Sequence, residues 1–186
     1  MTIYLLRHAE TESNKQGALS SISEDPLTVR GHEQAKLIVE ELMNLKISRV
    51  LCSLYPRAID TVSPFLKANS LKIELVANLA EGQLVLDSKI GHETPEYFES
   101  AMGKKYPIAN ETAEQFLGRA IEVAEMLSCF AQENVLVVSH GHMIRELLNI
   151  FQSTRKKTRY PHDNCGLSCI ELSSTPVVKF LNHRLA

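Results

Sequence analysis

Arginine and histidine side chains at three places in this sequence are of the types that bind anions. Arg7 and His8 are adjacent near the start of the chain, Arg57 comes later, and His140 lies in the tripeptide Ser139-His140-Gly141. A guanidinium group pairs its planar N–H donors with phosphate oxygens, and an imidazole adds a further donor. The set contains no carboxylate. It therefore favours a phosphate group or a similar anion, provided that these side chains meet.

Each of these residues follows a short apolar segment that is long enough for a strand and too short for a helix. Such segments occur at residues 3–6, 50–52, 73–76, 135–138 and 167–172. Arg7 follows the first of them, Arg57 comes soon after the second, and His140 comes soon after the fourth. Because the carboxyl ends of parallel strands share one edge of a sheet, we expect the three places to converge there. A helix that begins near Gly141 would add backbone N–H groups to the same pocket.

Helical patterns lie between the strand patterns. Apolar residues recur at intervals of three and four over residues 35–42 and 116–127, which predicts helices packed on a sheet. Thr112 to Gln115 is a candidate capping box for the later helix. Pro56 suits the first turn of a further helix, which Pro64 would kink or cut short. Polar loops are expected at residues 20–23 and 173–176. The alternation predicts a three-layer α/β/α fold with a mostly parallel central sheet.

The composition is that of an ordinary globular protein. The 186 residues are 44% hydrophobic and 23% charged, with a net charge of −2, so we expect one domain over residues 1–186 and no binding to nucleic acid. No apolar run is long enough to cross a bilayer, so no membrane association is expected. The four cysteines are too few for a disulfide framework, which favours reduced thiols and a cytoplasmic location.

Each motif has an ordinary alternative explanation when it is taken alone. Arg7 and His8 could form a surface loop, Arg57 could be a cation on a helix surface, and Gly141 could serve a turn. None of these alternatives explains why all three places follow strand patterns. His162, Cys165 and Cys169 lack the paired spacing of a zinc site, and we expect no metal there.

Five sequence blocks resemble, in order, motifs of the histidine phosphatase superfamily, whose members include the cofactor-dependent phosphoglycerate mutases. The blocks are Arg7-His8-Ala9-Glu10-Thr11 with Asn14; Pro26-Leu27-Thr28 with Gly31 and Gln34-Ala35; Ser53-Leu54-Tyr55-Pro56-Arg57-Ala58 with Thr61; Leu79-Ala80-Glu81; and Val138-Ser139-His140-Gly141 with Ile144-Arg145. Asn110-Glu111-Thr112 with Phe116 and Arg119, and Asn164-Cys165, fit weaker positions of the family.

The resemblance implies a mechanism. His8 would attack a phosphoryl group and carry it as a phosphohistidine. Arg7, Arg57 and His140 would hold the phosphoryl oxygens, and Asn14 and Gly141 would contribute to substrate binding. Glu81 would give a proton to the departing oxygen and then take one from water. The scheme requires neither a metal nor another cofactor.

The chain also departs from the family pattern. Many relatives have glycine where this chain has Ala9, and Ser20-Ser21 replaces a polar residue followed by glycine. The segment 82–110 is the expected lid, and it matches no subgroup. Substrate choice is expected to depend on it.

The leading hypothesis is a phosphatase that hydrolyses a small phosphorylated metabolite. After its last strand pattern the chain lacks the long tail associated with larger mutases, so water is the expected phosphoryl acceptor. A phosphoglycerate-type mutase, a phosphohistidine protein phosphatase and a non-catalytic module that recognises phosphate are the alternatives. The physiological substrate and the oligomeric state remain open.

Overall fold

The computed structural model describes residues 1–17, 25–82, 97–99, 105–107, 111–130, 132–153 and 158–184. Most of the predicted lid at 82–110 lies outside the described residues, apart from Gly82 and a two-stranded hairpin of β4 (Tyr97–Glu99) and β5 (Lys105–Pro107). The loop expected at residues 20–23 also lies outside them. The lid and the single domain over residues 1–186 therefore stay predictions.

A six-stranded sheet forms the centre of the fold, with the strand order β3-β2-β6-β1-β7-β8. The strands are β1 (Thr2–Arg7), β2 (Arg49–Cys52), β3 (Ile73–Leu75), β6 (Asn134–Ser139), β7 (Gly166–Glu171) and β8 (Val177–Arg184). The first four in space pair in parallel, and β7 and β8 add antiparallel strands beyond β1. The predicted, mostly parallel sheet is confirmed, together with all five predicted strands. β8 was not predicted, because it is a partly exposed edge strand without a buried apolar run.

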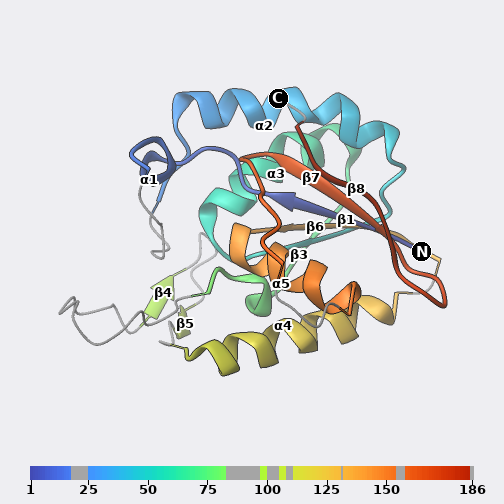
Figure 1. The fold of residues 1–186 in the computed structure, drawn as a ribbon. Helices are drawn as coiled ribbons and strands as arrows, with labels where there is room; N and C mark the ends of the chain where they lie inside the picture. Colours follow the sequence, from blue (N-terminus) through green and yellow to red (C-terminus); the bar gives the residue numbers. More distant parts are fainter. Residues whose placement is uncertain are drawn as a thin grey trace.

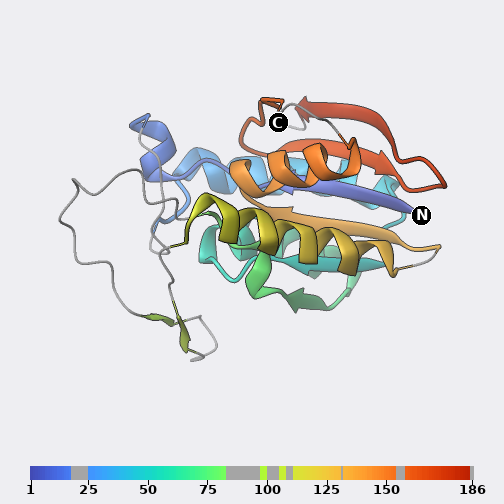
Figure 2. The same cartoon turned by 60° about the horizontal axis from the view of Figure 1, so that its bottom comes forward.

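Helices cover both faces of the sheet (Figures 1 and 2). On one face lie α2 (Val29–Asn44) and α3 (Pro56–Asn69), and on the other lie α4 (Ala113–Ser128) and α5 (Gly141–Phe151). The short elements are α1 (Glu12–Lys15) and the 3₁₀ turn η1 (Ala77–Leu79). The predicted three-layer α/β/α architecture is confirmed. Within the described ranges, no helix is both long and apolar enough to cross a membrane.

The strands place alternate side chains into two separate hydrophobic cores. Ile3 and Leu5 of β1 pack in the core that also contains the buried faces of α4 and α5. Leu6 lies in the opposite core, with the buried faces of α2 and α3. Every apolar position of β1 is therefore used, and the strand lies in the interior of the sheet, which holds its last residue, Arg7, in a rigid frame.

Local signals in the sequence start the helices. Thr112 and Gln115 form the predicted capping box of α4, and Pro56 lies in the first turn of α3. Pro64, in contrast, does not cut α3 short, because the helix continues to Asn69. A proline leaves the carbonyl four residues earlier without its helical partner. That residue is Asp60, which is exposed, so water can satisfy its carbonyl.

Gly31 in the first turn of α2 allows the helix to contact the segment after β1. A Cβ atom at this position would lie 2.1 Å from the backbone oxygen of Glu10. The same oxygen accepts a hydrogen bond from the backbone N–H of Thr28, the residue that caps α2. Because only a residue without a side chain fits here, Gly31 holds the segment that follows His8 close to α2.

The Gly31→Ala variant should be destabilised by about 1–3 kcal/mol, because the added methyl group must displace backbone atoms. The free energy of unfolding from urea titration measures the effect. Gly118→Ala is the matched control: Gly118 is an exposed glycine of α4, and a Cβ atom there meets no atom within 4 Å. That variant should gain roughly 0.5–1 kcal/mol, because alanine is the better helix former. Equal effects of the two variants would contradict this view of Gly31.

Candidate active site

The carboxyl ends of β1, β2 and β6 meet at one edge of the sheet, as the strand patterns predicted. Arg7 at the end of β1 is in register with Ser139 at the end of β6. The backbone N–H of His8 donates to the Ser139 carbonyl at 3.0 Å, and that of Ser53 donates to the Val138 carbonyl at 2.9 Å. These bonds continue the sheet beyond the strands. They bring the ring centroids of His8 and His140 to within 5.2 Å of each other.

His8 is held in one orientation and in one tautomer. Its side chain is 3% exposed, and its Nδ1 lies 2.8 Å from the carbonyl oxygen of Ala9. Because a carbonyl oxygen only accepts, Nδ1 carries the proton and Nε2 carries the lone pair. The carbonyl of His8 itself accepts from Asn164 Nδ2 at 3.1 Å and from the backbone N–H of Cys165 at 3.3 Å. The arrangement leaves the lone pair of Nε2 available.

His140 is completely buried and bound through Nε2 to the hydroxyl of Ser53, 2.7 Å away. The Ser53 hydroxyl already accepts from the backbone N–H of Tyr55 at 3.3 Å, so its own proton can point to Nε2 of His140. In that tautomer Nε2 accepts, and the single N–H proton of the neutral His140 ring is on Nδ1. Among the residues that the structure describes, this Nδ1 has no hydrogen-bond partner. It is therefore a buried donor that the described residues leave unsatisfied.

Two guanidinium groups adjoin the histidines. Arg57 comes from the first turn of α3, is completely buried, and stacks over the ring of Tyr55 at 4.6 Å. Arg7 donates from Nη1 to the carbonyl of His162 at 2.5 Å, whereas its buried Nε has no partner within the described ranges. Gly141, the first residue of α5, lies against the Arg7 guanidinium. The edge of the sheet is therefore rich in positive charge and in N–H donors.

Burial and the guanidinium groups keep both histidines neutral. Burial is the main cause that lowers the pKa of His8 well below 6.5, and Arg57 and Arg7 add to it. For His140 the main cause is again burial, followed by Arg57 and then His8. Burial also lowers the pKa of Arg7 and Arg57, and Glu81 opposes this in both cases. His8 is thus unprotonated while the guanidinium groups beside it are positive.

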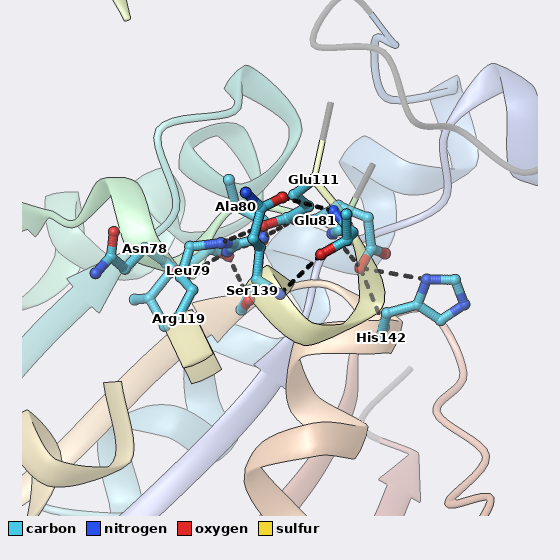
Figure 3. Close-up of polar contacts among 11 residues, drawn as sticks. Asn78, Leu79, Ala80, Glu81, Glu111, Arg119, Ser139 and His142 are labelled. Atoms are coloured by element: carbon cyan, nitrogen blue, oxygen red, sulfur yellow. Dashed lines mark hydrogen bonds and ion pairs between the residues drawn. The ribbon is translucent and has the colours of Figure 1, made fainter. Parts of the chain in front are cut away.

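Glu81 reaches the same edge from the segment that follows η1. Its side chain is 14% exposed, and Oε1 accepts from the backbone N–H of His142 at 3.2 Å and from that of Gly82 at 3.3 Å. The first of these donors belongs to the N-terminal turn of α5. Figure 3 shows this carboxylate between its own loop and the start of α5.

Asn14 belongs to the short helix α1 and is joined to the site through Asn164. Its Oδ1 accepts from Asn164 Nδ2 at 2.8 Å and from the backbone N–H of Thr11 at 3.4 Å. Its Nδ2 group, the donor end of the side chain, is the part suited to a phosphate oxygen. The structure therefore places all seven predicted site residues at one end of the sheet or in the segments that contact it.

Several supporting residues were not predicted from the residue pattern. Ser53 holds His140, Thr61 accepts from the backbone N–H of Ala9 at 2.8 Å, and the His162 carbonyl holds Arg7. Asp25 is a buried carboxylate whose charge acts on His8 and Arg57. Ser53 and Thr61 occur in the resembling blocks. The positions of Asp25 and His162 carry no pattern that periodicity could detect.

The buried histidines predict how stability depends on pH. Burial lowers the pKa of His162 to about 4, and those of His8 and His140 are also lowered. Stability should be complete above the pKa of an unfolded-chain histidine, about 6.5, and be lost as pH falls toward the lower folded-state values. In that window only the unfolded chain binds these protons. Each histidine contributes a slope of up to about 1.4 kcal/mol per pH unit.

Urea unfolding at pH values between 7 and 5 measures that slope. His8→Gln should reduce the slope by the contribution of one histidine, up to about 1.4 kcal/mol per pH unit. His32→Gln, at an exposed position of α2, is the matched control and should keep the slope of the unmodified protein. An unchanged slope in His8→Gln would show that His8 is not held neutral in the folded state.

The chain is similar in sequence to known phosphatases and mutases. The model of the histidine phosphatase superfamily (branch 1) matches residues 3–182. The adenosylcobalamin/alpha-ribazole phosphatase of Escherichia coli K12 is 27% identical over 164 residues, covering 80% of this chain and 77% of that protein. A probable phosphoglycerate mutase of Yersinia enterocolitica is 28% identical over 192 residues, covering 95% and 87%.

Among solved structures, the alpha-ribazole phosphatase of Shigella flexneri has the same fold. It superposes with a TM-score of 0.77 at 22% identity, over 99% of this chain and 97% of that one. The family match extends over β1, β2 and β6, and over the residues after them that include the two histidines and Arg57. The chain therefore belongs to the histidine phosphatase superfamily.

Proposed function

We propose that this protein is a phosphatase that hydrolyses a small phosphomonoester through a phosphohistidine formed on His8. The observation that carries the proposal is the state of His8: a neutral imidazole with its Nε2 lone pair available, buried beside His140 and two guanidinium groups. An imidazole in this state can attack phosphorus, whereas a protonated one cannot. The relatives named as phosphatases support the same reaction.

In the first step, Nε2 of His8 attacks phosphorus and the bond between phosphorus and the ester oxygen breaks. The departing oxygen takes a proton from Glu81, so an alcohol leaves and a phosphohistidine remains. In the second step, water attacks phosphorus and gives its proton to Glu81, the N–P bond breaks, and inorganic phosphate leaves. Both the enzyme and Glu81 return to their starting state, so one carboxyl group serves as acid and then as base.

The positive groups stabilise the phosphoryl group as it passes between oxygen and nitrogen. Arg7 and Arg57 face its oxygens with fixed charge, and His140 donates from Nδ1. Backbone N–H groups at the start of α5, beginning with Gly141, and the amide of Asn14 supply further donors. Because these groups are held before the substrate arrives, little reorganisation is needed during the transfer.

A phosphoglycerate-type mutase is the second candidate, favoured by the likeness to the Yersinia protein. It would use the same phosphohistidine but return the phosphoryl group to a hydroxyl of the substrate instead of to water. The two functions differ in the acceptor, not in the groups that hold the phosphate.

We also propose a cytoplasmic location, which the four free cysteines support.

His8→Ala should abolish phosphate release from p-nitrophenyl phosphate, a loss of at least about 1,000-fold, because no nucleophile remains. The unmodified enzyme, quenched during turnover with a radiolabelled phosphoester, should carry label that is stable in base and released by acid, as a phosphohistidine is. His183→Ala, on the exposed edge strand β8 and bound to Glu41, is the matched control and should keep full activity. Turnover without such a label would contradict the covalent step, and no turnover of any phosphoester would favour the non-catalytic module.

Incubation with 3-phosphoglycerate distinguishes the phosphatase from the mutase. Hydrolysis gives inorganic phosphate and glycerate, whereas a mutase gives the isomer without free phosphate. We expect phosphate to be released from at least one member of a panel of phosphorylated metabolites, with phosphate release as the readout. Isomer formation without phosphate would replace the proposal by the second candidate. Activity restricted to phosphohistidine proteins would show that the substrate is a phosphoprotein and not a small phosphomonoester.

A further inference from the structure

We infer that Arg119, fixed by Glu111, is a positioning residue that holds Glu81 in place for proton transfer. This inference rests on the proposed role of Glu81 as the general acid. Arg119 lies on α4, and Glu111 precedes the residue that caps this helix. The pair contacts the backbone on which Glu81 is carried, as Figure 3 shows.

Side chains hold three consecutive carbonyl groups just before Glu81. Arg119 donates from Nη1 to the carbonyls of Asn78 at 2.7 Å and of Ala80 at 2.8 Å. The hydroxyl of Ser139 donates to the carbonyl between them, that of Leu79, at 2.7 Å. Residues 78–80 form a turn and a loop, whose carbonyls lack the partners that a sheet would provide. Arg119 and Ser139 together replace those partners.

The Glu111 carboxylate fixes the plane of the Arg119 guanidinium. Nε of Arg119 donates to Oε2 of Glu111 at 3.0 Å, and Nη2 donates to Oε1. The two side chains are only 17% and 13% exposed. A bidentate pair of this kind is geometrically specific, and partial burial protects it from screening by salt. With Nε and Nη2 bound to Glu111, Nη1 must face the carbonyls before Glu81.

The ring of Phe116 contacts both Arg119 and the residue after Glu81. It stacks under the Arg119 guanidinium at 5.0 Å. It also lies so close to Gly82 that a Cβ atom there would come within 2.9 Å of the ring. Glu81 is therefore held on both sides, by carbonyl contacts before it and by an aromatic contact after it. The first two turns of α4 form a rigid support for the proposed acid.

The contacts distinguish positioning from substrate binding. All three guanidinium nitrogens of Arg119 already donate to protein groups. The neighbouring Glu111 carboxylate compensates its charge, which makes the pair a poor anion binder compared with Arg7 and Arg57. Arg119 thus acts on the reaction through Glu81. If Glu81 is displaced, the reaction rate should fall most for substrates whose departing oxygen needs a proton.

Two substrates that differ in their leaving group test the inference. A nitrophenolate ion departs without a proton, whereas the alkoxide of an alkyl phosphate such as glycerol phosphate needs one. Glu81→Gln should lower kcat/KM for the alkyl phosphate by about 100-fold and affect p-nitrophenyl phosphate far less. Arg119→Met and Glu111→Gln should show the same selectivity, with a loss of about tenfold for the alkyl phosphate and under about twofold for the aryl phosphate.

Glu122→Gln is the matched control. Glu122 also lies on α4 and binds the same loop, but only through the side chain of Asn78, at 3.0 Å. It should leave the ratio of the two substrates unchanged. In the double variant Glu81→Gln/Arg119→Met, the loss for the alkyl phosphate should equal that of Glu81→Gln alone, because a positioning residue has no effect once the acid is gone.

The outcomes separate the inference from the proposed function. If Glu81→Gln does not change the ratio, Glu81 is not the acid, and the proposed mechanism fails. If Glu81→Gln changes the ratio but Arg119→Met and Glu111→Gln lower both substrates equally, the pair is merely structural and the inference fails. Should Arg119→Met not fold, Glu111→Gln alone decides, since its neutral amide keeps the shape of the carboxylate. Additive losses in the double variant would also overturn the inference.

Discussion

The guanidinium group of Arg57 is completely buried at the edge of the sheet, and removing such a cation from water costs several kcal/mol. The nearby negative groups Glu81 and Asp25 oppose this cost only in part, because burial remains the largest effect on the pKa of Arg57. Burial also lowers the pKa of Arg7, although Arg7 is only partly buried. A bound phosphate group would add negative charge beside both guanidinium groups. The same positive field makes protonation of His8 unfavourable, so the groups proposed to bind the anion also keep the proposed nucleophile unprotonated.

These charges can be brought together only because the backbone is held from two directions. β1 lies between β6 and β7, and the residue after its end is bonded on both sides. The His8 backbone donates to Ser139, the last residue of β6, and accepts from Cys165 and Asn164 before β7. Parallel pairing brings His140 to the site, whereas the antiparallel extension immobilises His8. Both kinds of strand pairing are therefore needed for the geometry.

The sequence predicted the parts of the site that depend on periodicity. Short apolar runs located β1, β2 and β6, and the shared edge of parallel strands then brought His8, Arg57 and His140 together without any contact being known. Glu81 is different, because it follows a turn and no periodic pattern places it. The resemblance suggested it, and contacts of Arg119 with two backbone carbonyls explain its position. Such contacts depend on chain geometry, which sequence spacing does not encode.

Pro64 and β8 show the same limit. A proline predicts a lost hydrogen bond, but α3 continues past Pro64, and Asp60, whose carbonyl loses its partner, is an exposed residue. β8 is an exposed edge strand, so burial imposes no apolar run on it. In both cases solvent exposure decided the outcome, and exposure is a property of the folded chain.

The edge strand nevertheless contributes to the end of the sheet that carries the candidate site. The backbone N–H of Asn182 in β8 donates to the Ser168 hydroxyl at 2.9 Å, and that hydroxyl lies 2.7 Å from Nε2 of His162. Because the hydroxyl oxygen already accepts, its proton is free to point to His162, which burial keeps neutral by lowering its pKa to about 4. The carbonyl of His162 then holds Arg7. A series of hydrogen bonds thus connects the outer strand β8 to Arg7. Because His162 is neutral, it does not repel the Arg7 guanidinium that its carbonyl binds.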